Sequence, residues 1–159
     1  MAIFFFLFEK NNMSHKSKLI FCALSTFLPG SGLSWAYLKG VRHSGFHLHL
    51  ASLLIGIYGW NTLAQTEMSS TMGWIAVALG FTSLLASWIT TLVYGLRPDE
   101  KWDAQFNPNS NQTNQSGWLV IGCVIISLML GAFVLMSGLA IAFEQFFIAQ
   151  IEEARKLSQ

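Results

Sequence analysis

The stretch FLPGSGLSWAYLKGVRHSG, residues 27–45, decides how the chain is organised. A charge-free apolar run leads into it, the segment Pro29–Gly32 interrupts that run, and basic residues close it from Lys39 onwards. A proline inside a helix removes a backbone donor and clashes with the preceding turn, so a kink is expected there. We favour a kinked but continuous helix, and a re-entrant hairpin that turns at Pro29–Gly32 is the alternative. The pattern lacks the Lys-Ser/Thr ending of a phosphate-binding loop.

The composition is that of a membrane protein. The 159 residues are 53% hydrophobic and only 11% charged, roughly half the charged fraction of a soluble domain. Stretches of about 20 residues or more suffice, as helices, to cross a hydrocarbon core of roughly 30 Å. Four such stretches contain no Asp, Glu, Lys or Arg: Leu19–Leu38, Gly45–Ala64, Gly73–Leu96 and Trp118–Phe143. We therefore predict an all-α, polytopic transmembrane helical bundle with four candidate spans. The net charge of +1 gives no reason to expect a nucleic-acid partner.

The charged and polar segments divide the chain into three parts. Residues 1–18 form an N-terminal tail, and 1–12 are expected to be an upstream extension or an interfacial tail. Residues 19–64 hold the first two spans. The remainder, 65–159, holds the third and fourth spans, a surface helix over 97–106, a structureless polar loop over 107–117 and a helical C-terminal tail.

Small residues recur at steps of three and four along each span, which places them on one face of each helix. In lipid, close backbone approach at small residues and a few polar contacts hold helices together. Four such rows favour a compact bundle, within one chain or across an oligomer. The candidate packing seam consists of Gly32, Gly45, His49, Gly56, Gly73, Gly80, Ser83, Ser87, Ser127 and Gly131.

Three histidines lie close together in sequence, at His43, His47 and His49. Haem and metal sites need ligands that converge from several elements. These three sit at the start of one helix, and the only other histidine, His15, lies in the N-terminal tail. We therefore expect no cofactor and no metal. His43 and His47 are expected at the membrane interface, and His49 is expected to hydrogen-bond a neighbouring helix.

The segment LRPDEKWDAQF, residues 96–106, predicts a short helix on the membrane surface. Its proline suits a first helical position, and Asp99 and Glu100 suit the positive end of a helix. Trp102 and Phe106 are four residues apart and form an apolar face. We expect these two aromatic side chains at the interface and the acidic ones in water.

The segment PGSGLSWAYLKGVRHSGFHLHL, residues 29–50, resembles the signature of the TM-two domain family. That family shows a Gly-rich turn, a Gly-x-His-x-Phe-Tyr-Leu-Gly motif, a basic link and a glycine before its second span. The positions that match in type and spacing are Gly32, Tyr37, Leu38, Gly40 and Gly45. The resemblance covers about residues 16–64 and implies a small two-span membrane hairpin. The resemblance implies a fold more than an activity. We expect an integral membrane protein of the bacterial inner (cytoplasmic) membrane.

The distribution of Lys and Arg bears on orientation through the positive-inside rule. If four segments cross and the N-terminus is inside, five basic residues lie inside and four outside. If the first run is re-entrant, seven lie inside and two outside. Charge thus favours the hairpin, whereas length favours a full span. We expect four spans with both termini in the cytoplasm.

No pattern in the sequence indicates an enzyme. There is no nucleophile with a base, no paired-carboxylate site and no ligand cluster, and the two cysteines, Cys22 and Cys123, lie inside spans as small packing residues. We expect a non-enzymatic integral membrane protein, an accessory or assembly subunit that acts through helix packing. Its partners would be the lipid bilayer and a larger membrane protein or further copies of itself. The alternative is a small transporter or channel subunit, although Asp, Glu, Lys and Arg, which usually mark such pathways, are missing from the spans.

Overall fold

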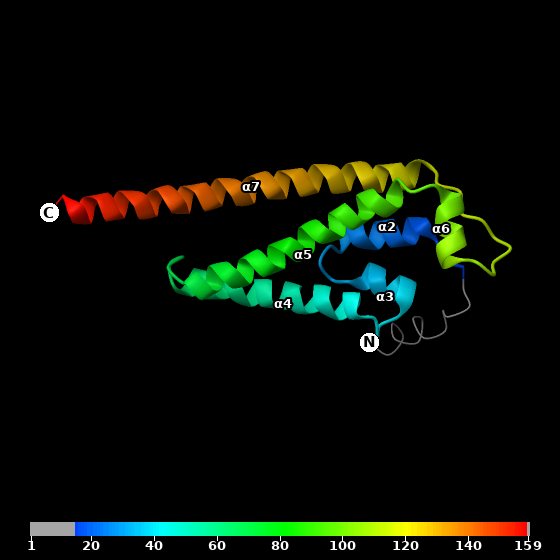
Figure 1. Cartoon of the computed structure of the whole chain (residues 1–159), viewed down its shortest axis with the longest axis horizontal. Coiled ribbons are helices and arrows are strands. Elements are labelled where there is room, and N and C mark those ends of the chain that lie inside the picture. The colour runs from blue at the N-terminus through cyan, green and yellow to red at the C-terminus, as the bar shows by residue number, and fades with distance from the viewer. Residues whose placement is uncertain (1–14, 159) are drawn as a thin grey trace.

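The computed structural model describes residues 15–158, so most of the predicted N-terminal tail lies outside the described residues. Within that range the chain is all-α and contains no strand. The elements are α2 Lys18–Phe27, α3 Leu33–Lys39, α4 Ser44–Gln65, α5 Thr71–Gly95, α6 Asp99–Phe106 and α7 Trp118–Leu157 (Figure 1).

The first apolar run is a helical hairpin. Helix α2 ends at Phe27, and α3 begins at Leu33 and runs back beside it (Figure 1). The turn contains Gly30 at φ +74° and Gly32 at φ +71°, backbone conformations that only glycine adopts readily. The backbone N–H of Ser17 donates to the Tyr37 hydroxyl at 2.8 Å, so the end of α3 has returned to the start of α2. The expected continuous, kinked helix is therefore wrong, because Pro29 and two left-handed glycines end α2 and reverse the chain.

Among the described residues, two helices are long and apolar enough to cross a membrane, α5 and α7, whereas four spans were expected. Helix α2 has only 10 residues because the hairpin ends it. Helix α4 has the length, with 22 residues, but polar side chains such as His47, His49 and Asn61 lower its hydropathy. Helix α7 has 40 residues, about 60 Å at 1.5 Å per residue, which is twice the thickness of a hydrocarbon core.

The helices form one elongated bundle (Figure 1). Helix α4 runs antiparallel to α5, and α7 returns along the other side of α5. Helix α2 packs against both α5 and α7. Three residue pairs define the contact between α5 and α7, and they advance by seven residues on both helices: Gly95 with Val124, Trp88 with Gly131, and Phe81 with Gly138.

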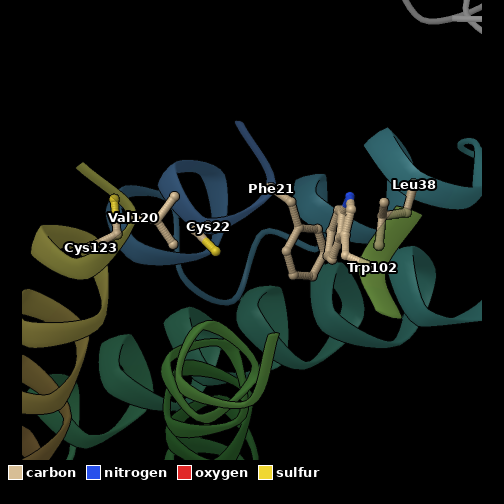
Figure 2. Packing of buried hydrophobic residues seen from close by; sticks show 6 residues of the cluster. All are labelled: Phe21, Cys22, Leu38, Trp102, Val120 and Cys123. Carbon is tan, nitrogen blue, oxygen red and sulfur yellow. The ribbon is translucent and has the colours of Figure 1, made fainter. Parts of the chain in front are cut away.

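The buried core lies at the end of the bundle where α2 begins and α6 crosses. Apolar side chains from α2, α3, α6 and α7 meet there, and Figure 2 shows the six most buried ones. They are Phe21, Cys22, Leu38, Trp102, Val120 and Cys123. Both cysteines are therefore packing residues without a disulfide. This core joins the hairpin to α6 and to the start of α7.

Candidate functional site

The two glycines at the tip of the α2–α3 hairpin, Gly30 and Gly32, are buried against the neighbouring helices, whereas Phe27 and Leu28 are exposed. A Cβ atom on Gly32 would lie 2.7 Å from the carbonyl oxygen of Phe46 and 2.9 Å from its Cα. Glycine is required here for two reasons: a side chain would collide with α4, and the backbone has a positive φ. On the other side of the turn, the backbone N–H of Gly30 donates to Ser87 Oγ of α5 at 2.7 Å.

Neighbouring helices satisfy the polar groups that the broken helix leaves at its tip. Thr26 Oγ1 lies 2.9 Å from Ser127 Oγ of α7. The Trp88 indole N–H of α5 donates to the Thr26 carbonyl at 3.2 Å. A helix interruption inside a membrane is tolerated only where such partners exist. Ser87 and Ser127, which the sequence placed on the packing seam, are therefore brought to the hairpin tip.

One buried polar atom near the tip is left without a partner among the described residues, Ser25 Oγ. Ser25 is 1% exposed and lies on α2, one helical turn from Cys22, which packs close to Gly95 of α5. Unsatisfied buried hydroxyls are uncommon in native proteins. A water or a small polar ligand beside Ser25 Oγ would give this hydroxyl a hydrogen-bond partner.

The three histidines, His43, His47 and His49, differ in their contacts. His49 Nδ1 lies 2.8 Å from Ser83 Oγ, so His49 and Ser83 join α4 to α5. His43 caps α4, because its Nδ1 accepts the backbone N–H of Gly45 at 3.0 Å, and its ring stacks on Trp35 with centroids 5.7 Å apart. His47 is exposed. Among residues 15–158 no three His, Cys, Asp or Glu side chains form a group that could hold a metal ion.

Helices α4 and α5 cross at glycines. A Cβ atom on Gly56 would lie 2.7 Å from Gly80 Cα, and one on Gly80 would lie 2.6 Å from Gly56 Cα. One turn further on, a Cβ on Gly59 would meet the carbonyl oxygen of Gly73 at 2.8 Å. We call this contact, formed by Gly56, Gly59, Gly73 and Gly80, the glycine crossing. Of the other candidate seam glycines, Gly131 makes only ordinary contact with Trp88, at 3.7 Å from a Cβ position, and Gly45 packs against His43 and Trp35.

Beside the glycine crossing lies an apolar groove of about 310 Å³. Its walls come from α4 and α5 and include Leu53 and Leu84, the two side chains nearest to a Cβ position on Gly30. The groove therefore begins where the hairpin ends. Its few polar lining groups, such as Asn61, offer no charge with which to bind an ion.

Helix α6 closes the end of the bundle. Lys18 at the start of α2 is 2% exposed, and its Nζ lies 2.9 Å from Asp99 Oδ1 and donates to the Arg97 carbonyl. Trp102 is fully buried, and its indole N–H donates to the Lys16 carbonyl at 3.0 Å. Phe106 packs on Trp102, with ring centroids 4.6 Å apart. The expectation that Trp102 lies on the interfacial face of α6 is wrong, because its ring fills the space between α2 and α5.

The loop over 107–117 holds α6 against the start of α2. Asn107 Oδ1 accepts the backbone N–H of Lys16 at 2.6 Å, and Asn114 Oδ1 accepts that of Lys18 at 2.9 Å. The amide nitrogens of both asparagines donate to Asp103 Oδ1, at 2.7 Å and 2.6 Å. The backbone N–H groups at the start of a helix have no acceptor within the helix. The loop supplies acceptors for α2 and for the residue that precedes it by two positions. We call these contacts, together with the Lys18–Asp99 pair, the polar latch.

The electrostatics of the polar latch follow from these hydrogen bonds. Burial alone would raise the pKa of Asp99, but hydrogen bonds from Ser116 and Lys18 outweigh it, so the pKa lies below the ordinary 3.8. Burial likewise works to raise the pKa of Asp103, and hydrogen bonds from Asn107 and Asn114 bring it below 3.8. Both carboxylates are therefore held in the charged form. The acidic side chains of α6 were expected to be a solvated face, and nothing local in the sequence indicates their partners.

Comparison of the chain with family models, curated proteins and solved structures finds no match. The resemblance to the TM-two domain family over residues 16–64 therefore stays a prediction.

Proposed function

We propose that this chain is a non-enzymatic integral membrane protein, an accessory or assembly subunit that acts by packing its helices against other membrane proteins or further copies. The observation that carries this proposal is the surface of α7. Large apolar side chains such as Phe133, Met136 and Phe143 are 60–71% exposed there, and α7 is twice as long as a membrane needs. Contiguous exposed apolar surface of this kind marks a membrane or protein contact.

In the proposed arrangement α4, α5 and α7 cross the membrane, and the α2–α3 hairpin enters and leaves on one side. Helix α4 is long enough, and its glycine crossing with α5 suits a pair of membrane helices. The side that carries α6 would hold the basic residues Lys16, Lys18, Lys39, Arg42, Arg97 and Lys101, whereas Arg155 and Lys156 would lie on the other. By the positive-inside rule the α6 side is cytoplasmic. With three crossings in place of four, the C-terminus lies outside and not in the cytoplasm as four spans would place it. The membrane of the proposal is the bacterial inner (cytoplasmic) membrane.

The proposal is tested by extraction and co-purification. Tagged full-length chain, expressed in its native host, should stay in the membrane pellet through an alkaline carbonate wash. After solubilisation in a mild detergent it should run with a stoichiometric partner, either a larger membrane protein or further copies. Release by carbonate would contradict the membrane assignment. A chain that stays in the pellet but is monomeric and alone after crosslinking in intact membranes would contradict the subunit role.

The runner-up, a small transporter or channel subunit, is favoured by one observation, the broken helix. Interrupted helices near the middle of a bundle are where many transporters bind their substrates, and Ser25 leaves a buried hydroxyl unpaired at that depth. Ion flux into vesicles distinguishes the two functions. The chain is reconstituted into vesicles that enclose dyes for protons, Na⁺ or K⁺. Flux that Ser25→Ala reduces would favour the transporter, and vesicles as tight as protein-free ones would exclude transport by the chain alone.

A further inference from the structure

We propose that the exposed face of α7 is the surface on which a second copy of this chain packs, as a parallel helix pair along residues 133–157. This inference rests on the proposed function and specifies its partner. It starts from the surface of α7 that turns away from the rest of the bundle (Figure 1).

The first observation is a seven-residue repeat on that surface. Eight positions recur at alternating steps of three and four, and every one is exposed: Phe133, Met136, Ala140, Phe143, Phe147, Gln150, Ala154 and Leu157. Such a repeat is the pattern by which two helices wind around each other. Val120, Cys123, Val124 and Ser127, which pack inward, lie on the other side of α7. We call the eight exposed positions the heptad face.

The second observation is where the heptad face lies along the bundle. The register of α7 against α5 puts Thr71, the first residue of α5, level with Ile148, so residues 149–157 extend past the other helices (Figure 1). The heptad face continues through this extension and beyond Glu144, where the charge-free stretch has ended. Lipid tails cover apolar side chains inside a membrane, but Leu157 follows the charged residues Glu152, Glu153, Arg155 and Lys156 and in the proposed arrangement lies beyond the tails. The repeat therefore needs a protein cover at its outer end.

The third observation concerns which protein fits. The heptad face carries no charged residue, so two copies meet without repulsion between like charges. Its one polar member, Gln150, both donates and accepts hydrogen bonds, so a two-fold axis would pair it with its own counterpart, as single amides do in coiled coils. Copies in one membrane share an orientation, which makes the helices parallel.

The exposed phenylalanines of the heptad face offer a large part of the area that a helix pair would bury. A buried aromatic side chain removes roughly 150–250 Å² from solvent, so three phenylalanines that are 60–71% exposed offer on the order of 300–500 Å² per chain. These three side chains thus supply about half of the roughly 800 Å² per partner that a standard interface buries, and the other five positions are exposed as well.

Site-directed crosslinking of full-length chain in proteoliposomes tests the inference. Gln150→Cys should form a disulfide-linked dimer on mild oxidation, and Glu152→Cys, on the opposite side of α7, should not. The native Cys22 and Cys123 are 0% and 7% exposed and do not compete. The crosslinking yield of Gln150→Cys should persist when the protein is diluted tenfold with lipid. Crosslinks that arise from random collisions would decline under the same dilution. Equal yields at the two positions, or none at Gln150→Cys, would overturn the inference.

A matched pair of substitutions gives a second readout. Phe147→Gln on the heptad face should weaken dimerisation roughly tenfold or more, as expected for an aromatic anchor, whereas Ile148→Gln beside it should not. Single-molecule photobleaching in lipid measures the dimer fraction. Both side chains are exposed, so helicity should be unchanged in each variant. A dimer that survives Phe147→Gln would overturn the inference.

The outcomes also separate this inference from the proposed function. If wild-type chain resists carbonate and co-purifies with a larger membrane protein, but Gln150→Cys gives no homodimer, the proposed function stands and this inference fails. If carbonate releases the chain, the proposed function fails, and the inference fails with it.

Discussion

Gly56 of α4 and Gly80 of α5 touch backbone to backbone, with less than 3 Å between the Cα of each and a Cβ position on the other. No other residue type fits at either position without moving a helix. The two helices therefore meet with no side chain between them, and this contact sets the spacing between α4 and α5.

Gly80→Ala should separate α4 from α5 and lower the stability of the protein. Overpacking of this kind costs about 1–3 kcal/mol. Gly122→Ala on α7 is the matched control, because a Cβ there meets nothing within 4 Å, and a helical Gly-to-Ala change in open space should stabilise by up to about 1 kcal/mol. Thermal aggregation in detergent measures both. Equal aggregation temperatures for Gly80→Ala and Gly122→Ala would contradict the glycine crossing.

Ser87→Ala should loosen the hairpin tip, because it leaves the backbone N–H of Gly30 buried and unpaired. Such a loss costs about 1–3 kcal/mol. Thr82→Ala serves as the control, since the Thr82 hydroxyl donates to the Leu79 carbonyl of its own helix. Hydrogen exchange at Gly30 should accelerate in Ser87→Ala and stay unchanged in Thr82→Ala. Unchanged exchange in both variants would show that α5 does not hold the tip.

Asp99→Asn should destabilise the end of the bundle more than Lys18→Met does. The Lys18 side chain is 3% exposed and that of Asp99 is 22% exposed, so removing Asp99 leaves a buried charge without its counter-ion, at a cost of about 3 kcal/mol. Removing Lys18 leaves a carboxylate that water can still reach. Glu100→Gln, on the exposed side of the same helix, is the control. The prediction fails if Lys18→Met proves the more damaging change in chemical denaturation.

The polar latch should weaken in acid. The pKa values of Asp99 and Asp103 lie below 3.8 in the folded chain, so each group contributes stability that is fully present above that pH. The contribution is lost as pH falls through the lowered pKa, because the unfolded chain then takes up the proton first. Denaturation followed from pH 6 to pH 3 should show this loss in wild type and a flatter profile in Asp103→Asn. Parallel profiles would contradict the role of Asp103.

Local patterns in the sequence predict much of the helix layout. The charge-free stretch Gly45–Ala64 corresponds to α4, Ser44–Gln65, and Gly73–Leu96 corresponds to α5, Thr71–Gly95. The predicted surface helix over 97–106 corresponds to α6, Asp99–Phe106. These agreements depend on hydropathy and helix-start signals, which act over a few residues.

The hairpin and the polar latch could not be predicted in this way. A proline followed by two glycines permits either a kink or a reversal, and Ser87, far along the chain, holds the reversal in place. Similarly, Asn114 resembles any other residue of a polar loop until the fold brings it to Lys18, 96 positions away. Long-range partners decide both features, and no local spacing encodes them.

The polar latch also sets an order of events during synthesis. Lys18 is made 81 residues before Asp99, its partner, which at about 5–20 residues per second is a delay of roughly 4–16 s. During that interval α2 has neither the counter-ion of Lys18 nor the asparagines that complete its N-terminus. The hairpin can therefore reach its final place only after α4 and α5 have been made, although it is translated before both of them.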